Sequence, residues 1–178
     1  MVYILQANEA DSMIINQLAW QIFPETYCEI LTPSQIDYMM EWMYSVSSLT
    51  QQMAQGHRYF LLCELNSEGR RKPCGYVSIE QEAPQLWHLQ KIYVLPEKQG
   101  LGYGAALFRH AVAYIKELNT TKVRSGETAA PCGIELNVNR NNRARLFYER
   151  MGMHIVRQGN FPIGEGFFMQ DYIMRLDV

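Results

Sequence analysis

Two periodic patterns of hydrophobic residues alternate along the chain, one with the period of a β-strand and one with that of an α-helix. Short runs of β-branched and aromatic residues indicate strands, whereas apolar residues three or four positions apart indicate helices. The predicted strands are residues 2–6, 58–64, 74–82, 86–95, 132–138, 153–157 and 167–176. The predicted helices are residues 8–22, 32–46, 105–118 and 141–152. The pattern therefore predicts an α/β protein with the element order βααβββαβαββ.

Local polar signals mark the ends of several predicted elements. Asn8 and Thr32 are suited to cap the first two helices, because their side-chain oxygens can accept bonds from exposed helical amides. Asn141 is expected to cap the last helix, and Gly152 is expected to end it in a left-handed conformation. Three polar or proline-containing segments are expected to interrupt the elements: residues 23–27, 66–73 and 119–131.

The composition is that of one folded domain, residues 1–178. Apolar residues make up 48% of the 178 residues, which is too many for a disordered chain. The net charge is −2 and basic residues are interspersed with acidic ones, which argues against a nucleic-acid partner. No apolar run approaches the roughly 20 residues that span a bilayer. The first residues do not resemble a secretory signal, so we expect a cytoplasmic protein with no membrane partner.

The most informative stretch of the chain is a glycine-rich turn between a predicted strand and a predicted helix. Its residues are Gln99, Gly100, Leu101, Gly102, Tyr103 and Gly104. Glycine has no Cβ, so the backbone amides of such a turn can approach a ligand closely. The helix that follows adds unpaired amides and a positive dipole end, which favour an anion such as a diphosphate.

Two common phosphate-binding loops fit this turn less well. A P-loop ends in Gly-Lys-Ser or Gly-Lys-Thr, whereas Gly104 is followed by Ala105. A Rossmann glycine follows its strand almost at once, whereas residues 96–99 intervene here. A glycine triplet alone is also compatible with a tight turn that binds nothing. The four cysteines are widely spaced without a C-x-x-C pair, which predicts neither a metal site nor a disulfide framework.

A second motif changes this picture. Residues 141–152 have the pattern Asn-x-x-Ala-x-x-Phe-Tyr-x-x-x-Gly. Together with the glycine turn, this pattern resembles the GCN5-related N-acetyltransferases, the GNAT family, in the blocks that bind acetyl-CoA and carry the family's Asn and Tyr. Residues 31–40 look like the early helix of PaiA-type members, some of which acetylate polyamines.

The resemblance implies a mixed central sheet flanked by helices and a direct acetyl transfer from acetyl-CoA to a primary amine. It implies no metal. The acceptor would be a polyamine or another small amine. A peptide or protein amine remains open, as does a non-catalytic acyl-CoA-binding module with the same fold. The oligomeric state is also open, with a homodimer as one option.

The resemblance also assigns cofactor roles. Gly100, Gly102 and Gly104 would donate amides to the diphosphate, and Gln99 would begin that loop. Backbone groups of the central strand would pair with the pantetheine arm as an added strand does. The full cofactor-binding set is Ile92, Tyr93, Val94, Gln99, Gly100, Leu101, Gly102, Tyr103, Gly104, Asn141 and Tyr148.

The resemblance makes Tyr148 the candidate general acid, which would protonate the departing CoA thiolate. The alternative is a core tyrosine on the inner face of a helix. Glu80 and His88 are the candidate bases. The position at which many family members carry a glutamate is Gln90 here, and glutamine cannot act as a base, so a water relay becomes plausible.

The region before residue 55 suggests the chemistry of the acceptor. It carries four carboxylates among aromatic residues: Glu25, Glu29, Asp37 and Glu41 with Trp20, Tyr27, Tyr38 and Trp42. Carboxylates attract a cation, and aromatic faces can hold its ammonium or methylene groups. The alternative is an outer helix face on which the acids are merely solvated.

Overall fold

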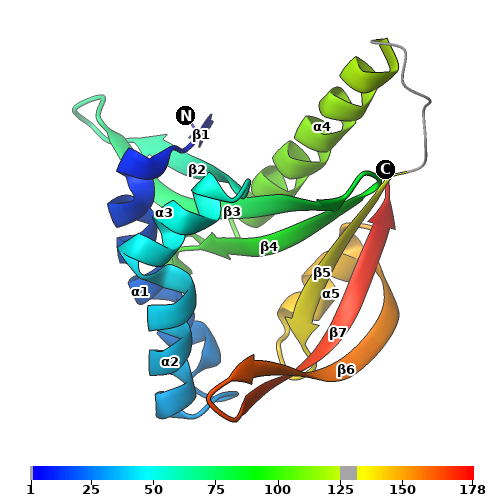
Figure 1. Ribbon diagram of the computed structural model, residues 1–178. Helices are drawn as coiled ribbons and strands as arrows, with labels where there is room; N and C mark the ends of the chain where they lie inside the picture. The colour runs from blue at the N-terminus through cyan, green and yellow to red at the C-terminus, as the bar shows by residue number, and fades with distance from the viewer. Residues whose placement is uncertain (1, 125–131) are drawn as a thin grey trace. The chain divides into compact units, whose positions relative to one another are not determined.

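The computed structural model describes residues 2–124 and 132–178 (Figure 1). The strands are β1 (Val2–Gln6), β2 (Arg58–Leu65), β3 (Arg71–Ala83), β4 (Leu86–Val94), β5 (Gly133–Asn139), β6 (His154–Gly164) and β7 (Phe167–Asp177). The helices are α1 (Ser12–Tyr27), α2 (Pro33–Tyr44), α3 (Val46–Ala54), α4 (Tyr103–Arg124) and α5 (Ala144–Arg150). Two short 3₁₀ turns precede α1 and α4: η1 (Glu9–Asp11) and η2 (Pro96–Lys98).

The strands form one mixed sheet in the order β1-β2-β3-β4-β5-β7-β6. β4 pairs with β5 in parallel, and Leu86–His88 lie opposite Gly133–Glu135. The pairs β1–β2, β2–β3, β5–β7 and β6–β7 are antiparallel. The predicted α/β class with a mixed sheet is therefore confirmed.

The described chain divides into two compact units. The first contains the described residues up to Ile79 together with Lys91–His110. The second contains Glu80–Gln90 and the described residues from Ala111 onwards. β3, β4 and α4 contribute to both units, so the boundary passes through secondary-structure elements. A single domain over residues 1–178 stays a prediction.

Aromatic side chains form the core of the first unit. Helices α1, α2 and α3 pack against one another (Figure 1). The ring of Phe23 lies 4.4 Å from that of Tyr27 and 5.2 Å from that of Tyr44, between centroids. Tyr93 on β4 lies 5.7 Å from Tyr76 on β3. These rings bury large apolar areas, and because Tyr93 also meets Tyr44, they fix the helices against β4.

A buried lysine also links the helices of the first unit to β4. The side chain of Lys91 donates to Oε1 of Gln52 on α3 at 2.6 Å, and Lys91 is 4% exposed. Its ammonium lies 5.4 Å from the ring centroid of Tyr59, whose hydroxyl donates to the same Gln52 oxygen at 2.6 Å. A buried charge needs such partners, because its desolvation is costly.

Two predictions for the helices of the first unit are wrong. The first helix continues through residues 23–27, and Pro24 lies within its last turns. The carbonyl of Pro24 still accepts a helical hydrogen bond from the amide of Cys28 at 2.9 Å. The second predicted helix is two helices. Ser45 has ψ 149, which ends α2, and its hydroxyl accepts from Ser48 to begin α3. The element order is therefore βαααβββαβαββ.

The cap before the first helix was predicted correctly, whereas the turn between β2 and β3 was not. Asn8 caps as expected, since its side chain accepts from Ala10 at 2.9 Å, although the turn it caps is η1. The predicted turn over residues 66–73 is too long, because β3 already begins at Arg71. Oδ1 of Asn66 accepts the amides of both Glu68 and Arg70 and closes a shorter turn.

The second unit contains a long β-hairpin formed by β6 and β7 (Figure 1). The predicted strand over residues 153–157 is too short, because pairing continues to Gly164. Only Glu165 and Gly166 separate the strands, with φ of 48° and 77°. Positive φ at both central residues is what a two-residue type I′ hairpin turn requires. Helix α4 likewise continues through residues 119–124, and residues 125–131 of the predicted loop lie outside the described residues.

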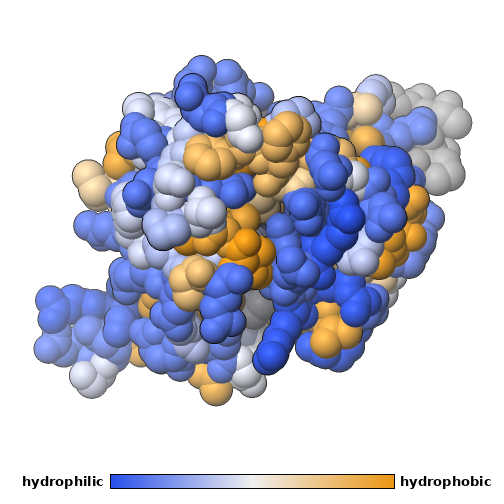
Figure 2. All heavy atoms as spheres, turned by 90° about the horizontal axis from the view of Figure 1, so that it is seen from below, coloured by the Kyte–Doolittle hydropathy of each residue, from blue (hydrophilic) through white to orange (hydrophobic). Residues whose placement is uncertain are grey.

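The surface mixes hydrophilic and apolar side chains. Figure 2 shows hydrophilic residues over most of one face, with apolar residues gathered in several groups among them. The exposed large apolar side chains include Trp20 on α1 and Trp42 on α2. Within residues 2–124 and 132–178, no helix is both long enough and apolar enough to span a bilayer.

Candidate active site

The glycine-rich loop lies in the first unit, between η2 and α4. Gly100 and Gly102 have φ of +77° and +81°, a left-handed conformation that side chains rarely tolerate. A Cβ built on either glycine would find no heavy atom of the described residues within 4 Å. The glycines are therefore required by the backbone conformation rather than by packing, and the space beside the loop is open.

The start of α4 presents backbone amides at this loop. The amide of Ala106 donates to the carbonyl of Gly102 at 3.0 Å, which is the first hydrogen bond of the helix. The preceding amides, those of Tyr103, Gly104 and Ala105, therefore have no acceptor within the helix. Unpaired amides at the positive end of a helix dipole bind anions well, so these residues fit a diphosphate.

Gln99 connects the loop to the end of β4. Its side-chain amide donates to the carbonyl of Val94 at 3.2 Å, and its backbone amide donates to that of Pro96 at 3.1 Å. Leu95, the residue that follows β4, donates its amide to the carbonyl of Cys74 on β3 at 2.8 Å. The structure thus brings two predicted cofactor residues, Val94 and Gln99, into direct contact. The carbonyl of Val94 already has a partner, so pantetheine pairing would fall to other backbone groups of Ile92–Val94.

Glu80, one of the two candidate bases, lies in the second unit. The amide nitrogen of Gln90 donates to Oε2 of Glu80 at 3.0 Å. The amide of Gln90 is not a base, but it holds in place the Glu80 carboxylate, which is the candidate base. Glu80 and Gln90 are both partly exposed, which leaves room for a water molecule to reach the carboxylate.

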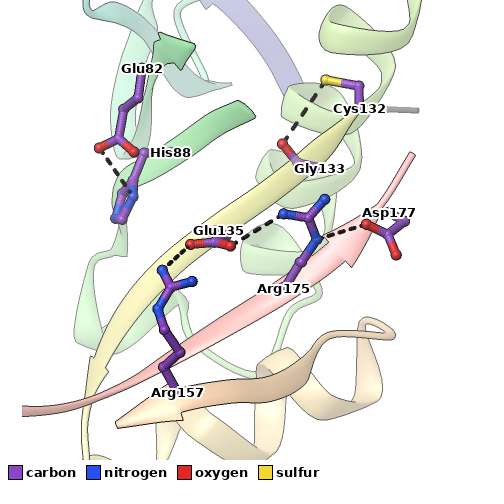
Figure 3. A network of polar contacts seen from close by, with 8 residues as sticks. All are labelled: Glu82, His88, Cys132, Gly133, Glu135, Arg157, Arg175 and Asp177. Atoms are coloured by element: carbon purple, nitrogen blue, oxygen red, sulfur yellow. Dashed lines mark hydrogen bonds and ion pairs between the residues drawn. The ribbon is translucent and has the colours of Figure 1, made fainter. Parts of the chain in front are cut away.

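His88, the other candidate base, lies next to a second glutamate (Figure 3). Its Nδ1 is 3.4 Å from Oε1 of Glu82, and the His88 side chain is 14% exposed. Burial lowers the pKa of His88, and the nearby Glu82, Glu135 and Glu80 oppose that shift. Because burial dominates, the imidazole is neutral at pH 7 and has the protonation state that a base needs.

A third carboxylate near His88 is already neutralised. Oε2 of Glu135 lies 2.6 Å from Arg157 and Oε1 lies 3.2 Å from Arg175, which also contacts Asp177 (Figure 3). Glu135 is 5% exposed. Its charge is paired on both oxygens, so it links β5, β6 and β7.

Tyr148 lies on α5 and is 8% exposed. Its ring meets that of Phe147 at 5.2 Å between centroids. Its backbone carbonyl accepts the amides of Met151 and Met153, both at 3.0 Å. Gly152 between them has φ +93°, so the predicted left-handed end of this helix is confirmed. The closing turn thus fixes the backbone of Tyr148, while its role as an acid stays a prediction.

Asn141 is not the cap of α5, contrary to the sequence-based expectation. The side chain that accepts the amide of Ala144, at 2.9 Å, belongs to Asn142. Asn141 lies one residue earlier, is exposed, and donates its backbone amide to Oδ1 of Asn139 at 3.0 Å. The residue directly before α5 is Arg143, whose side chain makes no capping bond, so Asn142 reaches the first amide of the helix from one residue further back. A role of Asn141 in cofactor binding stays a prediction.

Comparison with known families identifies the architecture. The family model described as the acetyltransferase (GNAT) domain matches residues 56–153, more than half of the chain. The chain belongs to the GNAT family. Its membership confirms the resemblance seen in the glycine loop and the Asn-Tyr helix. It also confirms the enzyme class, an acetyltransferase that uses acetyl-CoA as co-substrate.

Solved GNAT structures share the fold over nearly their whole length. The PaiA N-acetyltransferase of Thermoplasma acidophilum, solved with coenzyme A, has a TM-score of 0.76 and 17% identity, covering 100% of this chain and 99% of its own. The ribosomal-protein-S18-alanine N-acetyltransferase of Escherichia coli has a TM-score of 0.67 and 19% identity, covering 100% and 94%. The IAA acetyltransferase of Bacillus cereus has a TM-score of 0.61 and 16% identity, covering 100% of both chains. No curated protein sequence matches significantly.

Within each unit, the structure shows contacts of the candidate residues that the sequence did not suggest. Gln90 supports Glu80, and Glu64 on β2 contacts both Lys98 and Tyr103 beside the glycine loop. Glu64 and Lys98 are 34 residues apart, so no local spacing could have revealed their contact. No group of three or more His, Cys, Asp or Glu side chains that could hold a metal ion occurs in the described part of the chain.

The burial of His88 leads to a prediction about how the stability of the folded protein depends on pH. Its folded pKa is lowered, so below its ordinary pKa, about 6.5, the unfolded chain takes up a proton that the folded protein does not. The stability that neutral His88 confers is therefore present above pH 6.5 and is lost as the pH falls. His88→Gln should lose less unfolding free energy than the parent between about pH 7 and 5.5.

Denaturant titration at each pH measures this difference. The control is His154→Gln, since His154 is exposed on β6, and this variant should keep the parent's pH dependence. A His88→Gln variant with the same pH slope as the parent would contradict the account of His88 as a buried neutral group.

Proposed function

We propose that this GNAT acetyltransferase transfers the acetyl group of acetyl-CoA to the primary amine of a small cationic molecule, with a polyamine as the representative acceptor. The observation that carries the proposal is the uneven distribution of charge. Residues 1–57 contain six acidic residues and no lysine or arginine, for a net formal charge of −6. Residues 58–178 contain 12 acidic and 16 basic residues, for a net of +4. A cationic acceptor would be attracted to the acidic segment, and an anionic cofactor would be attracted to the basic one.

The exposed surface of α2 supports a cationic acceptor more specifically. Asp37 and Glu41 are exposed one helical turn apart. Beside them, the rings of Tyr38 and Trp42 stack with centroids 5.8 Å apart, and Trp42 is 48% exposed. An ammonium group attracted by the carboxylates could also rest on an aromatic face, which is the usual arrangement for alkylammonium recognition.

The solved GNAT structures permit more than one class of acceptor. One relative in fold is named a PaiA N-acetyltransferase, and another acetylates an alanine of ribosomal protein S18. Both are less than 20% identical to this chain, so they share its fold without defining its acceptor. A peptide amine is therefore the second candidate. The charge of residues 1–57 favours the small cation.

We propose the following roles in the reaction. The neutral amine attacks the thioester carbonyl and a C–N bond forms, after which the C–S bond breaks to release the thiolate. Glu80, held by Gln90, takes the ammonium proton directly or through a water molecule, and His88 is the alternative base. The hydroxyl of Tyr148 gives its proton to the thiolate, since a phenol with a pKa near 10 can protonate a thiolate held beside it. The new amide nitrogen loses its extra proton to the Tyr148 phenolate that remains once the thiolate has been protonated. No covalent enzyme intermediate is needed.

The cofactor roles are also part of the proposal. The amides of the glycine loop and of the first turn of α4 would hold the diphosphate, and backbone groups of Ile92–Val94 would pair with the pantetheine arm. Asn141, which is exposed just before α5, would contact the pantetheine or phosphate region, as the family resemblance implies. We also propose that the enzyme is cytoplasmic.

Tyr148→Phe tests the proposed acid. The substitution keeps the ring and its contact with Phe147 and removes only the hydroxyl, so kcat should fall on the order of 100-fold while KM for acetyl-CoA changes little. The measurement is thiol release at saturating acetyl-CoA. The matched control is Tyr172→Phe on β7, which should retain the parent rate. A Tyr148→Phe variant as fast as the parent would make Tyr148 a core residue only.

The acceptor proposal makes a kinetic demand. If charge attraction captures the acceptor, kcat/KM for spermidine should fall severalfold between about 0.05 M and 0.3 M salt, because screening weakens such attraction. The double variant Asp37→Asn, Glu41→Gln should lower kcat/KM for spermidine and flatten its salt dependence. Steady-state kinetics with varied spermidine measures both effects.

The control for this experiment is Glu117→Gln, which removes an exposed charge from α4 and should leave spermidine kinetics unchanged. Efficient acetylation of a peptide, with spermidine inert at every salt concentration, would remove the polyamine proposal and support the peptide acceptor. Release of no thiol with any amine would support the non-catalytic alternative.

A further inference from the structure

One carboxylate in the first unit contacts residues on both sides of the glycine loop. Oε2 of Glu64 lies 2.6 Å from Nζ of Lys98, and Oε1 accepts a hydrogen bond from the hydroxyl of Tyr103. Each oxygen therefore has its own partner. The Glu64 and Lys98 side chains are 21% and 24% exposed, so the ion pair is shielded from most of the solvent.

The positions of these partners give the contact its significance. Lys98 is the last residue of η2 and directly precedes Gln99, whereas Tyr103 is the first residue of α4 and directly follows Gly102. Glu64 thus holds both ends of a four-residue segment whose two glycines are left-handed. Glu64 itself is fixed, because β2 pairs it with Val2 on one side and with Lys72 on the other.

The charges of this group support one another at neutral pH. The pKa of Glu64 is lowered, most strongly by the hydrogen bond from Lys98 and next by the one from Tyr103. The hydrogen bond to Glu64 in turn raises the pKa of Lys98 and that of Tyr103. Glu64 stays ionised and Lys98 stays protonated across the physiological range. Because Glu64 balances the charge of Lys98, the loop would attract a diphosphate mainly through its backbone amides.

We propose that Glu64 is a positioning residue for acetyl-CoA. It holds Lys98 and Tyr103 so that the backbone between them keeps the conformation in which its amides can bind the diphosphate. A loop that is ordered before the ligand arrives loses less entropy on binding, so its affinity is higher. The inference rests on the proposed role of the glycine loop and names a residue outside that loop that the role depends on.

Glu64→Gln tests this inference, because the substitution keeps the size of the side chain and removes the charge. The Kd for coenzyme A and the KM for acetyl-CoA should both rise roughly tenfold, the change expected for the loss of a charge-assisted contact. The kcat at saturating acetyl-CoA and the KM for the amine should stay within about twofold of the parent, because Glu64 does not take part in the chemistry. Calorimetry with coenzyme A and steady-state kinetics measure these quantities.

The control is Glu68→Gln, which breaks an exposed ion pair with Arg70 in the turn after β2 and should leave coenzyme A binding unchanged. A double-mutant cycle adds a second measurement. Tyr103→Phe should weaken coenzyme A binding in the parent but add little in the Glu64→Gln background, because the hydroxyl then lacks its charged acceptor.

Several outcomes would overturn the inference. Unchanged coenzyme A affinity in Glu64→Gln would show that the loop keeps its conformation without Glu64. Tighter binding would show that Glu64 merely withholds the charge of Lys98 from the ligand. A fall in kcat accompanied by comparable rises in both KM values would indicate a general structural defect. A parent protein that fails to bind coenzyme A would overturn the proposed function itself, and this inference with it.

Discussion

The structure depends on a helix start whose first amides have no acceptor within the helix. Helix α4 begins its hydrogen bonds at Ala106, so the amides just before it must find acceptors outside the helix. The left-handed Gly100 and Gly102 bend the chain into this helix start and leave space beside it. Contacts from Gln99 and Glu64 hold the loop from both flanks. This arrangement supports the proposed diphosphate site, because a diphosphate would supply acceptors for these amides.

The sequence predicted those features that local pattern determines. Strand periodicity, the glycine turn and the left-handed Gly152 depend on residues close in sequence. The glycine turn and Gly152 were found where expected, and each predicted strand corresponds to a strand of the sheet, although β6 extends further than the pattern indicated. The errors arose where local signals compete. Pro24 usually ends a helix, yet in the last turns of α1 it removes only one donor. Asn141 and Asn142 are both of a residue type that favours caps, yet the residue directly before α5 is Arg143.

Contacts between distant residues could not be predicted in the same way. The partners of Glu64 lie 34 and 39 residues away, and Lys91 finds Gln52 across a gap of 39 residues. Such pairs become visible only when strands and helices are in place, because polar groups that enter the interior must then find partners. The same reason explains why Gln90, which cannot act as a base, was not recognised as the support of Glu80.

Acetyl-CoA binding by the glycine loop is the central claim, and calorimetric titration of the purified protein with acetyl-CoA tests it most directly. The parent protein should bind, and Gly102→Val should not, because a β-branched residue cannot adopt the left-handed conformation that φ +81° requires. Gly69→Val is the matched control, since Gly69 has φ +71° in the β2–β3 turn and the substitution would introduce a similar backbone strain there. The account predicts that this control binds like the parent. Equal binding by the Gly102→Val variant, or no binding by the parent, would contradict it.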